Sequence, residues 1–297
     1  MIPAPRSSAG ISAEAWALIV LLSLPWGGSF IFYRVLAADL PAFTIVLARV
    51  GMAAPVLYAL VRLGGQKLDI PWRAFAVMAL LNNVIPFVLY AWAETRVTSG
   101  VAAILNAFTP IATALVLHGF GAERLTRVRV AGVALGFAGV AVLVGPDLRT
   151  LGHDLPADLA CLAATVSYGF AALWSRRLRH VAPLQAATGQ IVCSTLLLVV
   201  PTLLIDRPWL LPMPGMTVWL NLLGIALLST AAAYVIFFRI LAVAGAANLM
   251  LVTFLIPVSA LAMGMAFLGE PITVQALGGM ALIAAGLATI DGRLLRR

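Results

Sequence analysis

The sequence predicts an all-α integral membrane protein, with ten transmembrane helices in two five-helix repeats of inverted topology around a central cavity. Three observations lead to this prediction. The 297 residues are 63% hydrophobic and only 10% charged, with a mean hydropathy of +1.06, so too few polar side chains are present for a soluble surface. Ten apolar stretches are long enough to cross a membrane. The two halves of the chain also repeat each other.

Each expected span is an apolar stretch of roughly 18–25 residues, which matches a hydrocarbon core about 30 Å thick. In chain order the spans are residues 13–35, 41–62, 72–93, 98–119, 128–145, 157–175, 183–205, 216–238, 245–268 and 273–290. The segment before the first span carries one charge, Arg6, and no convincing cleavage site. We therefore expect the first span to be retained and not removed as a signal peptide.

Residues 110–141 repeat at residues 257–288 without a gap. A shift of 147 places Pro110 on Pro257, Phe120 on Phe267, Glu123 on Glu270, Gly132 on Gly279 and Gly139 on Gly286. A looser similarity at a shift of 141 or 142 extends the duplication towards the start of each half, pairing Gly28 with Gly169 and Pro41 with Pro183. The sequence therefore predicts two domains, residues 1–150 and 151–297.

Five spans in each copy is an odd number, so the second copy must enter the membrane from the opposite face. The copies are then related by a pseudo-two-fold axis in the membrane plane, which is typical of carriers with a binding site near mid-membrane. Such a pair has two nearly equivalent conformations, one open to each side. The repeat therefore favours transport by alternating access.

The basic residues indicate the orientation. With the N-terminus in the cytoplasm, fourteen Lys and Arg residues fall on the cytoplasmic side and four on the other side, namely Arg34, Arg96, Arg149 and Arg207. The opposite orientation would contradict the positive-inside rule. We therefore expect both termini to be cytoplasmic. The same bias explains the net charge of +8, so a nucleic-acid partner is not expected.

A proline in the fourth span of each copy, a short loop with a glutamate and a glycine-rich fifth span form a signature. Its residues are Pro110, Glu123, Gly132, Gly136 and Gly139, and then Pro257, Glu270, Gly279 and Gly286. With this signature the chain resembles bacterial EamA-type carriers of the drug/metabolite transporter superfamily, YddG-like amino-acid exporters among them. The resemblance covers nearly the whole chain and implies a multi-pass protein of the bacterial cytoplasmic (inner) membrane. It does not identify the cargo.

Polar and aromatic residues that recur at a shift of 147 are the candidates for a substrate-binding cavity. The overlaid pairs are Asn83 with Thr230, Phe87 with Tyr234, Tyr90 with Phe237, and Asn106 with Thr253. The first three members in each copy are spaced i, i+4 and i+7, which places them on one helix face. Trp26, Phe30 and Tyr168 are further candidates. Aromatic rings with a few amides and hydroxyls suit a small neutral or zwitterionic metabolite, such as an amino acid.

Pro110 and Pro257 follow Asn106 and Thr253 by four residues. A proline removes one backbone donor and clashes with the carbonyl four residues earlier. The carbonyls of Asn106 and Thr253 are therefore available to an ammonium or hydroxyl group of the cargo, unless neighbouring side chains or water satisfy them. The two prolines are equally candidates for hinges or kinks.

Arg49, about eight residues into the second span, is the one charge clearly inside the membrane, at a cost of roughly 2.5–3.5 kcal/mol. It binds either a substrate carboxylate or, as we favour, helix-end carbonyls or an acid such as Glu94 or Glu270. No acid lies at mid-span, and Glu94 is expected at a helix end. Because a carboxylate relay for protons is missing, we expect facilitated export without obligatory proton coupling.

Two features of the signature have structural explanations. The glycines of the fifth and tenth spans form stripes that permit close helix approach, either within the bundle, as we favour, or in a dimer. Glu123 and Glu270 lie at the starts of these spans, where a carboxylate favours the helix dipole, so we expect them to act as caps.

Other function classes find less support. No HExxH or GxSxG motif occurs and the three histidines are scattered, so we expect no enzyme, no catalytic residue, no metal site and no cofactor. Charge rings or filter loops of a channel are not evident. The alternative within carriers is a multidrug or nucleotide-sugar type, but phosphates need several inward-facing cations and only Arg49 qualifies. The expected partners are a small-molecule substrate and membrane lipids, with a monomer expected and a dimer as the alternative.

Overall fold

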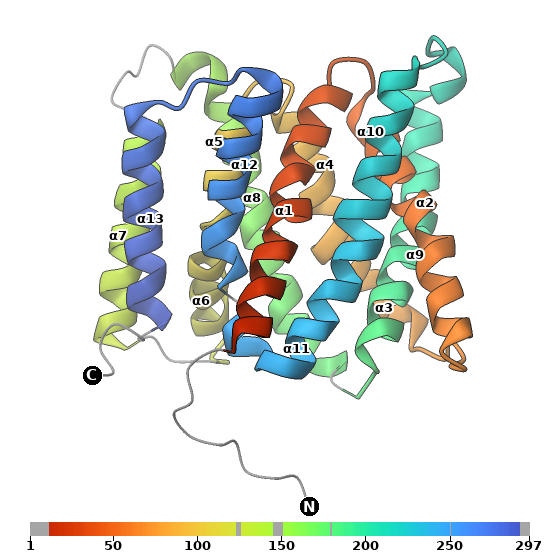
Figure 1. The fold of residues 1–297 in the computed structure, drawn as a ribbon, viewed down its shortest axis with the longest axis horizontal. Coiled ribbons are helices and arrows are strands. Elements are labelled where there is room, and N and C mark those ends of the chain that lie inside the picture. The colour runs from red at the N-terminus through yellow and green to blue at the C-terminus, as the bar shows by residue number, and fades with distance from the viewer. Residues whose placement is uncertain (1–11, 123–125, 145–150, 179, 250, 292–297) are drawn as a thin grey trace, which may run out of the picture.

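The computed structural model describes residues 12–122, 126–144, 151–178, 180–249 and 251–291. Within these ranges the helices stand side by side and cross the bundle ten times (Figure 1), and the described residues contain no strand. We number the crossings spans 1 to 10 along the chain. The predicted all-α membrane fold is confirmed.

In the first half, several spans are built from more than one helical segment. Span 1 is α1 (Ala13–Leu36), span 2 is α2 (Ala42–Leu63), span 3 joins α3 (Trp72–Ala79), the π-helical η1 (Leu80–Val84) and α4 (Ile85–Ala93), span 4 joins α5 (Ser99–Asn106) and α6 (Thr109–Gly119), and span 5 is α7 (Arg127–Val144).

The second half repeats this plan. Span 6 is α8 (Leu151–Ser175), followed by the 3-10 turn η2 (Arg176–Leu178); span 7 joins α9 (Pro183–Pro201) and the π-helical η3 (Thr202–Asp206), with the 3-10 turn η4 (Pro208–Leu210) in the next loop; span 8 joins α10 (Met216–Ala226), the π-helical η5 (Leu227–Ala232) and α11 (Ala233–Leu249); span 9 is α12 (Val252–Leu268) and span 10 is α13 (Val274–Asp291).

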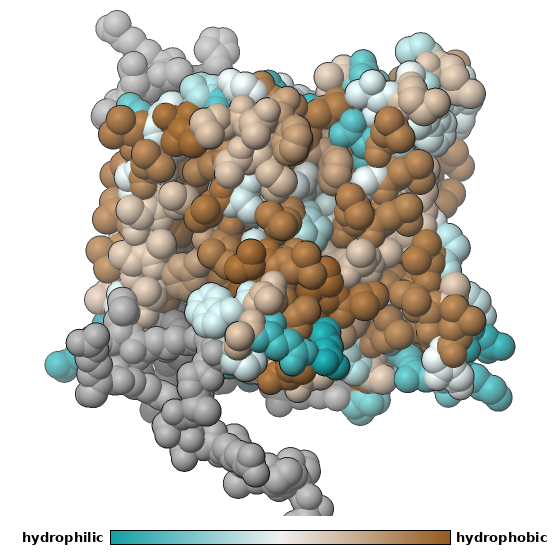
Figure 2. Space-filling model, viewed as in Figure 1, coloured by the Kyte–Doolittle hydropathy of each residue, from teal (hydrophilic) through white to brown (hydrophobic). Residues whose placement is uncertain are grey.

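Seven of the described helical runs are long and apolar enough to cross a membrane, and three shorter apolar helices lie in spans 5, 9 and 10. The helices α7 and α13 have 18 residues each, which gives a length of about 27 Å at 1.5 Å per residue. Hydrophobic residues cover most of the face seen in Figure 2, and hydrophilic residues gather near its lower and upper edges. This distribution fits a protein surrounded by lipid.

The boundary between spans 8 and 9 differs from the prediction. The sequence predicts that span 8 ends at residue 238 and that span 9 begins at residue 245, whereas α11 continues to Leu249 and α12 begins at Val252. Within α11, Gly245 has φ 76° and ψ 169°, a conformation that is accessible to glycine and interrupts the helical run. Hydropathy cannot detect such an interruption because both flanking segments are apolar.

Helix packing has the two-fold pattern expected of two related halves. Span 1 packs on span 9, and correspondingly span 6 packs on span 4; span 3 packs on span 6, and span 8 on span 1. Spans 2 and 7 pack on each other, as do spans 5 and 10. In Figure 1, α1 begins at the lower end of the bundle and α8 at the upper end, so the first span of each half runs in the opposite direction.

The π-helical segments of spans 3 and 8 also correspond. A shift of 147 places Leu80, the start of η1, on Leu227, the start of η5. A π-helical turn contains one extra residue and is frequent at functional sites. Pro86 follows η1, but Ala233 stands at the equivalent position after η5, so proline alone does not explain both segments.

The helices α7 and α13 meet backbone to backbone through the predicted glycine stripes. A Cβ atom added to Gly139 would lie 2.8 Å from the carbonyl oxygen of Gly279, and one added to Gly286 would lie 2.5 Å from the carbonyl oxygen of Gly132 and 2.8 Å from the nitrogen of Gly136. Packing within the bundle, the favoured interpretation of these glycines, is confirmed. The stripe joins the two repeats at one edge of the molecule (Figure 1).

This contact predicts the effect of a matched pair of substitutions. Gly286→Val should lower the free energy of unfolding by about 1–3 kcal/mol, because the side chain would overlap the backbone of α7. Ala285→Val, at the exposed neighbouring position, should have little effect. Thermal unfolding of both variants in detergent checks the prediction, and equal midpoints would contradict the backbone contact.

Candidate functional site

The guanidinium of Arg49 on α2 is buried between the two repeats, with 5% of the residue exposed. Its Nε donates to the hydroxyl of Thr230 at 3.0 Å, its Nη1 donates to the hydroxyl of Tyr33 at 2.6 Å, and its Nη2 reaches the carbonyl oxygen of Ser229 at 3.5 Å. The guanidinium carbon lies 3.9 Å from the centre of the Phe87 ring. All of these partners are electrically neutral.

The partners of Arg49 differ in part from those expected. The contact with a helix carbonyl is present, at Ser229, but neither Glu94 nor Glu270 is among its hydrogen-bond partners in the described part of the chain. Hydroxyls and ring faces stabilise a cation but do not neutralise it. Arg49 is therefore a positive charge that no described carboxylate compensates.

The π-helical segment η5 supplies the partners of Arg49 from the second repeat. The hydroxyl of Thr230 donates to the carbonyl oxygen of Ile225, five residues earlier, at 3.0 Å, while its oxygen accepts from Arg49. Because a π turn breaks the regular i to i+4 pattern, it leaves carbonyls such as that of Ser229 with capacity for another donor. The structure thus brings the predicted site residue Thr230 to Arg49.

Three predicted aromatic residues form a second group beside this one. The ring centres of Trp26 on α1 and Phe237 on α11 are 5.9 Å apart, and those of Phe237 and Tyr234 are 6.4 Å apart. Arg49 lies close enough to the hydroxyls of Tyr234 and of Tyr168 on α8 for electrostatic interaction. Residues predicted from spans 1, 6 and 8 therefore gather around one region.

These rings are half-buried on the inner faces of their helices. Leu24 on α1 and Val235 on α11 are exposed on the outer surface. Trp26 is two residues from Leu24 and Phe237 two from Val235, a rotation of about 200° around a helix. These rings therefore lie away from the exposed faces of α1 and α11, and they pack against the hydrophobic core.

Phe30, Tyr90 and Asn106 form a more closed cluster. The rings of Phe30 and Tyr90 meet edge to face with centres 5.5 Å apart. The hydroxyl of Tyr90 donates to Asn106 Oδ1 at 3.0 Å. Phe30 and Tyr90 are buried, so in this conformation the cluster joins spans 1, 3 and 4.

Asn83 departs from the predicted arrangement. It is fully buried, and its Nδ2 donates to the hydroxyl of Ser194 on α9 at 2.9 Å. The extra residue of the π-helical η1 changes the angular spacing that the sequence analysis assumed between Asn83 and Phe87. The Asn83 amide is therefore committed to helix packing against α9.

The carbonyl released by Pro110 has a partner within the chain. Span 4 breaks after Asn106, and the hydroxyl of Thr109 donates to the carbonyl oxygen of Asn106 at 2.7 Å. A neighbouring side chain thus satisfies this group, which was one of the two expected outcomes. Thr253 is half-buried near the start of α12, and Pro257 lies inside this helix.

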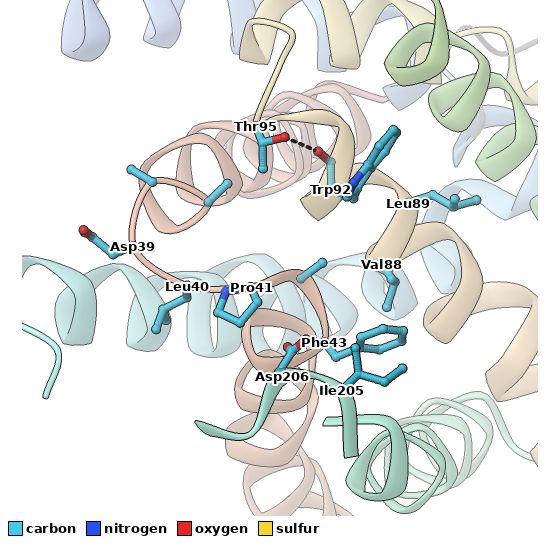
Figure 3. A pocket seen from close by; sticks show the side chains of 13 residues that line it. Asp39, Leu40, Pro41, Phe43, Val88, Leu89, Trp92, Thr95, Ile205 and Asp206 are labelled. Atoms are coloured by element: carbon cyan, nitrogen blue, oxygen red, sulfur yellow. Dashed lines mark hydrogen bonds between the residues drawn. The ribbon is translucent and has the colours of Figure 1, made fainter. Parts of the chain in front are cut away.

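A cavity of about 580 Å³ lies where α1 and α4 end and α2 begins, and Figure 3 shows its lining residues. It is lined by the turn from Ala37 to Phe43, by α4 residues such as Val88 and Trp92, and by Ile205 and Asp206 at the end of span 7. Asp206 accepts hydrogen bonds from the nitrogen and hydroxyl of Thr44 at 2.6 Å and 2.9 Å, so it caps the start of α2. None of the predicted site residues lines this cavity.

Comparison with known proteins identifies the family. The sequence pattern of the EamA-like transporter family matches the chain twice, at residues 14–145 and at residues 155–290. The chain belongs to the EamA-like transporter family. The predicted resemblance is confirmed, and this EamA-family chain is a multi-pass membrane transporter of a small-molecule substrate and not an enzyme. The predicted domain boundary at residue 150 lies between the two matches and stays a prediction.

Relatives of this EamA-family transporter are similar over nearly their full length. The "uncharacterized transporter YoaV" of Bacillus subtilis is 23% identical over 274 residues, which cover 91% of this chain and 94% of that protein. A Salmonella typhimurium protein described as a "probable amino-acid metabolite efflux pump" is 26% identical over 287 residues, 91% of this chain and 92% of that protein. A solved crystal structure shares the fold, with a TM-score of 0.69 and 21% identity over 96% of this chain and 99% of its own.

Sequence reasoning missed three polar residues of this transporter's interior. Tyr33 holds Arg49. Asn82 Nδ2 donates to Gln190 Oε1 at 2.9 Å, and Gln190 Nε2 donates to the hydroxyl of Tyr234 at 3.2 Å. Asn82, four residues before Pro86, and its neighbour Asn83 were a usable signal, because a freed carbonyl and two adjacent amides in an apolar span indicate a local irregularity.

Glu270 caps a helix, as expected, but not the helix that the sequence analysis predicted. Its carboxylate accepts from the nitrogen and hydroxyl of Ser99 at 3.0 Å and 2.6 Å and from the nitrogen of Gly100 at 3.3 Å. It therefore caps α5 in the first repeat and not α13, because the loop before α13 folds over the start of α5. Glu123 lies outside the described residues.

Two glutamates of this EamA-family transporter make a matched test of that cap. Glu270→Gln replaces one acceptor oxygen by a donor that faces backbone N–H groups, so it should lower the free energy of unfolding by about 1–2 kcal/mol. Glu14→Gln removes only an exposed ion pair with Arg239 and should have little effect. Thermal unfolding in detergent distinguishes them; a larger effect of Glu14→Gln would contradict the assignment.

Proposed function

We propose that this chain exports amino acids, or similar small neutral or zwitterionic metabolites, across the bacterial cytoplasmic membrane by alternating access. One observation carries the proposal: the guanidinium of Arg49 is buried among neutral groups from both repeats, close to a group of aromatic rings. An amino acid has a carboxylate that would bind the guanidinium and an apolar side chain that would contact the aromatic rings.

The electrostatic argument concerns the cost of the buried charge. A charge removed from water is costly unless an opposite charge accompanies it. The partners of Arg49 use one N–H on each of its three nitrogens, whereas a guanidinium has five N–H donors. The remaining donors suit the two oxygens of a carboxylate. Substrate binding would thus supply the missing anion.

The position of Arg49 supports coupling of binding to conformational change. Tyr33 and Phe87 belong to the first repeat, whereas Ser229 and Thr230 belong to the second. A carboxylate bound here would contact both repeats near the pseudo-two-fold axis, where carriers of this symmetry hold their substrates. The ammonium group of the substrate would face the ring of Tyr234, which attracts a cation.

The alternative cargo classes fit these residues less well. A nucleotide sugar carries phosphates that need several cations, and Arg49 is the one basic residue that we assign to this site. A drug cation would be repelled by Arg49 and has no acid beside it among the described residues. The relative described as a probable amino-acid metabolite efflux pump also favours amino acids.

The orientation is part of the proposal. The starts of α1, α3, α7 and α9 lie at the same end of the bundle, together with the end of α13 (Figure 1). The predicted excess of Lys and Arg belongs to this end, so we assign it to the cytoplasm. Both termini would then be cytoplasmic, and export would proceed towards the upper end in Figure 1.

Transport assays in proteoliposomes test the cargo and the role of Arg49 together. Counterflow should be supported by apolar amino acids and not by their amides or the corresponding amines, which lack the carboxylate. Arg49→Gln should weaken the apparent affinity for the acid by about tenfold or more, the value of one or two charge-assisted hydrogen bonds. Tyr33→Phe, which keeps the charge, is the matched control and should weaken it less.

The result that contradicts this assignment is clear. If Arg49→Gln retains its thermal stability and discriminates acid from amide as the wild type does, Arg49 does not bind the carboxylate. If neither acids nor amides undergo counterflow, the cargo class is wrong.

A second assay tests the prediction of export without obligatory proton coupling. In liposomes with equal substrate on both sides, an imposed pH gradient should not drive net accumulation of labelled amino acid. The expected concentration ratio stays at one, with or without an ionophore that collapses the gradient. Accumulation that disappears with the ionophore would show proton exchange.

A further inference from the structure

Glu94, which follows α4, is a buried acid that the mechanism above does not use. The residue has an exposed fraction of 0%, and neither of its carboxyl oxygens has a hydrogen-bond partner among the described residues. The sequence analysis expected it at a helix end, and it is the residue after α4, but tertiary packing removes it from water. Leu36, Val97 and Ser99 are also buried, so the Glu94 side chain is shut off from water although the cavity lined by Trp92 and Thr95 lies at the same end.

Titratable groups from several elements surround Glu94. They are Tyr33 and Arg34 on α1, Tyr90 on α4, Cys161 on α8, and Glu270 before α13. Asp158 on α8 lies near Cys161. Two of them affect its charge most. Glu270 accepts three hydrogen bonds at the start of α5. Arg34 donates to the backbone carbonyl oxygen of Glu94 at 2.6 Å and not to its carboxyl group.

These surroundings favour the neutral form of the Glu94 side chain. Burial and the nearby Glu270 carboxylate raise the pKa of Glu94 well above its usual range, while Arg34 acts in the opposite direction. An ionised carboxylate without a partner in this position would carry the desolvation cost of a buried charge. A proton removes that cost.

We propose that Glu94 is a proton-binding site whose occupancy accompanies closure of this end of the bundle. On closure the carboxylate takes a proton from water and becomes a carboxylic acid; on opening the O–H bond breaks and the proton returns to water. The inference rests on the proposed function only in assuming that the bundle opens and closes at this end.

The position of Glu94 in the membrane determines whether its proton can drive transport. This end is extracytoplasmic in the proposed orientation, so the proton enters and leaves on one side of the membrane. It therefore tunes the conformational equilibrium without driving transport, and export remains uncoupled from the proton gradient. The alternating-access cycle would respond to external pH.

The sign of the pH effect follows from linkage. In the open form Glu94 has an ordinary pKa, and in the closed form a raised one. Closure is fully favoured below the ordinary pKa and weakens progressively as the pH rises towards the raised value, by at most about tenfold in the equilibrium constant per pH unit. High pH should open this end.

Cysteine accessibility tests the proposal without any transported substrate. In a chain with Cys161→Ala and Cys193→Ala, a reporter at Ala93→Cys lies at a buried position, and Thr95→Cys lies at an exposed position two residues away. Each purified protein in lipid nanodiscs is labelled with a membrane-impermeant maleimide from pH 5.5 to 8.5. The ratio of the two labelling rates corrects for thiol ionisation.

The expected ratio rises several-fold with pH when Glu94 is present. In the Glu94→Gln background, which resembles the protonated form, it should stay low and flat. Glu94→Asp should keep a pH-dependent rise, and Glu270→Gln should move the midpoint to lower pH because a negative neighbour is removed. A flat ratio with Glu94 present, or an unchanged pH response in folded Glu94→Gln, overturns the proposal, whatever the outcome of the amino-acid assays.

Discussion

The buried charge of Arg49 is the constraint on which the functional account depends. The side chain is held by Tyr33, Thr230 and the Phe87 ring, so it is fixed in place, yet every one of these groups is neutral. These neutral partners orient the guanidinium but do not neutralise its charge. A carrier that must release its substrate benefits from such a site, because a permanent internal ion pair would compete with the substrate carboxylate.

The duplicated architecture explains how the site is assembled and how it can change. The π-helical segments η1 and η5 correspond between the repeats, and the α7–α13 contact joins the repeats through glycines. The helix breaks do not correspond. Span 4 breaks at Ala107 and Phe108, whereas the equivalent positions of span 9 lie inside α12. The two repeats thus have different conformations, as expected of an inverted-repeat carrier in one of its two states.

The sequence was sufficient for features set by the membrane itself. Backbone polar groups in lipid must be satisfied within the chain, so apolar length predicted the crossings, and the glycine stripes predicted close packing within the bundle without identifying the partner helix. Local periodicity also placed Tyr234 and Phe237 on one helix face, and their ring centres are 6.4 Å apart. It failed at Asn83 because a π turn changes the helical phase. The partners of Arg49 and the burial of Glu94 depend on residues up to 181 positions away in the chain, which no local pattern contains.

The central claim is that the substrate carboxylate binds Arg49 between the repeats. The most direct measurement is an experimental structure of the transporter with a transported amino acid bound. The account predicts a carboxylate oxygen about 3 Å from an Arg49 nitrogen, with the side chain of the amino acid against Trp26 or Phe237. An amino acid bound elsewhere, with Arg49 still held only by Tyr33, Thr230 and Ser229, would contradict it.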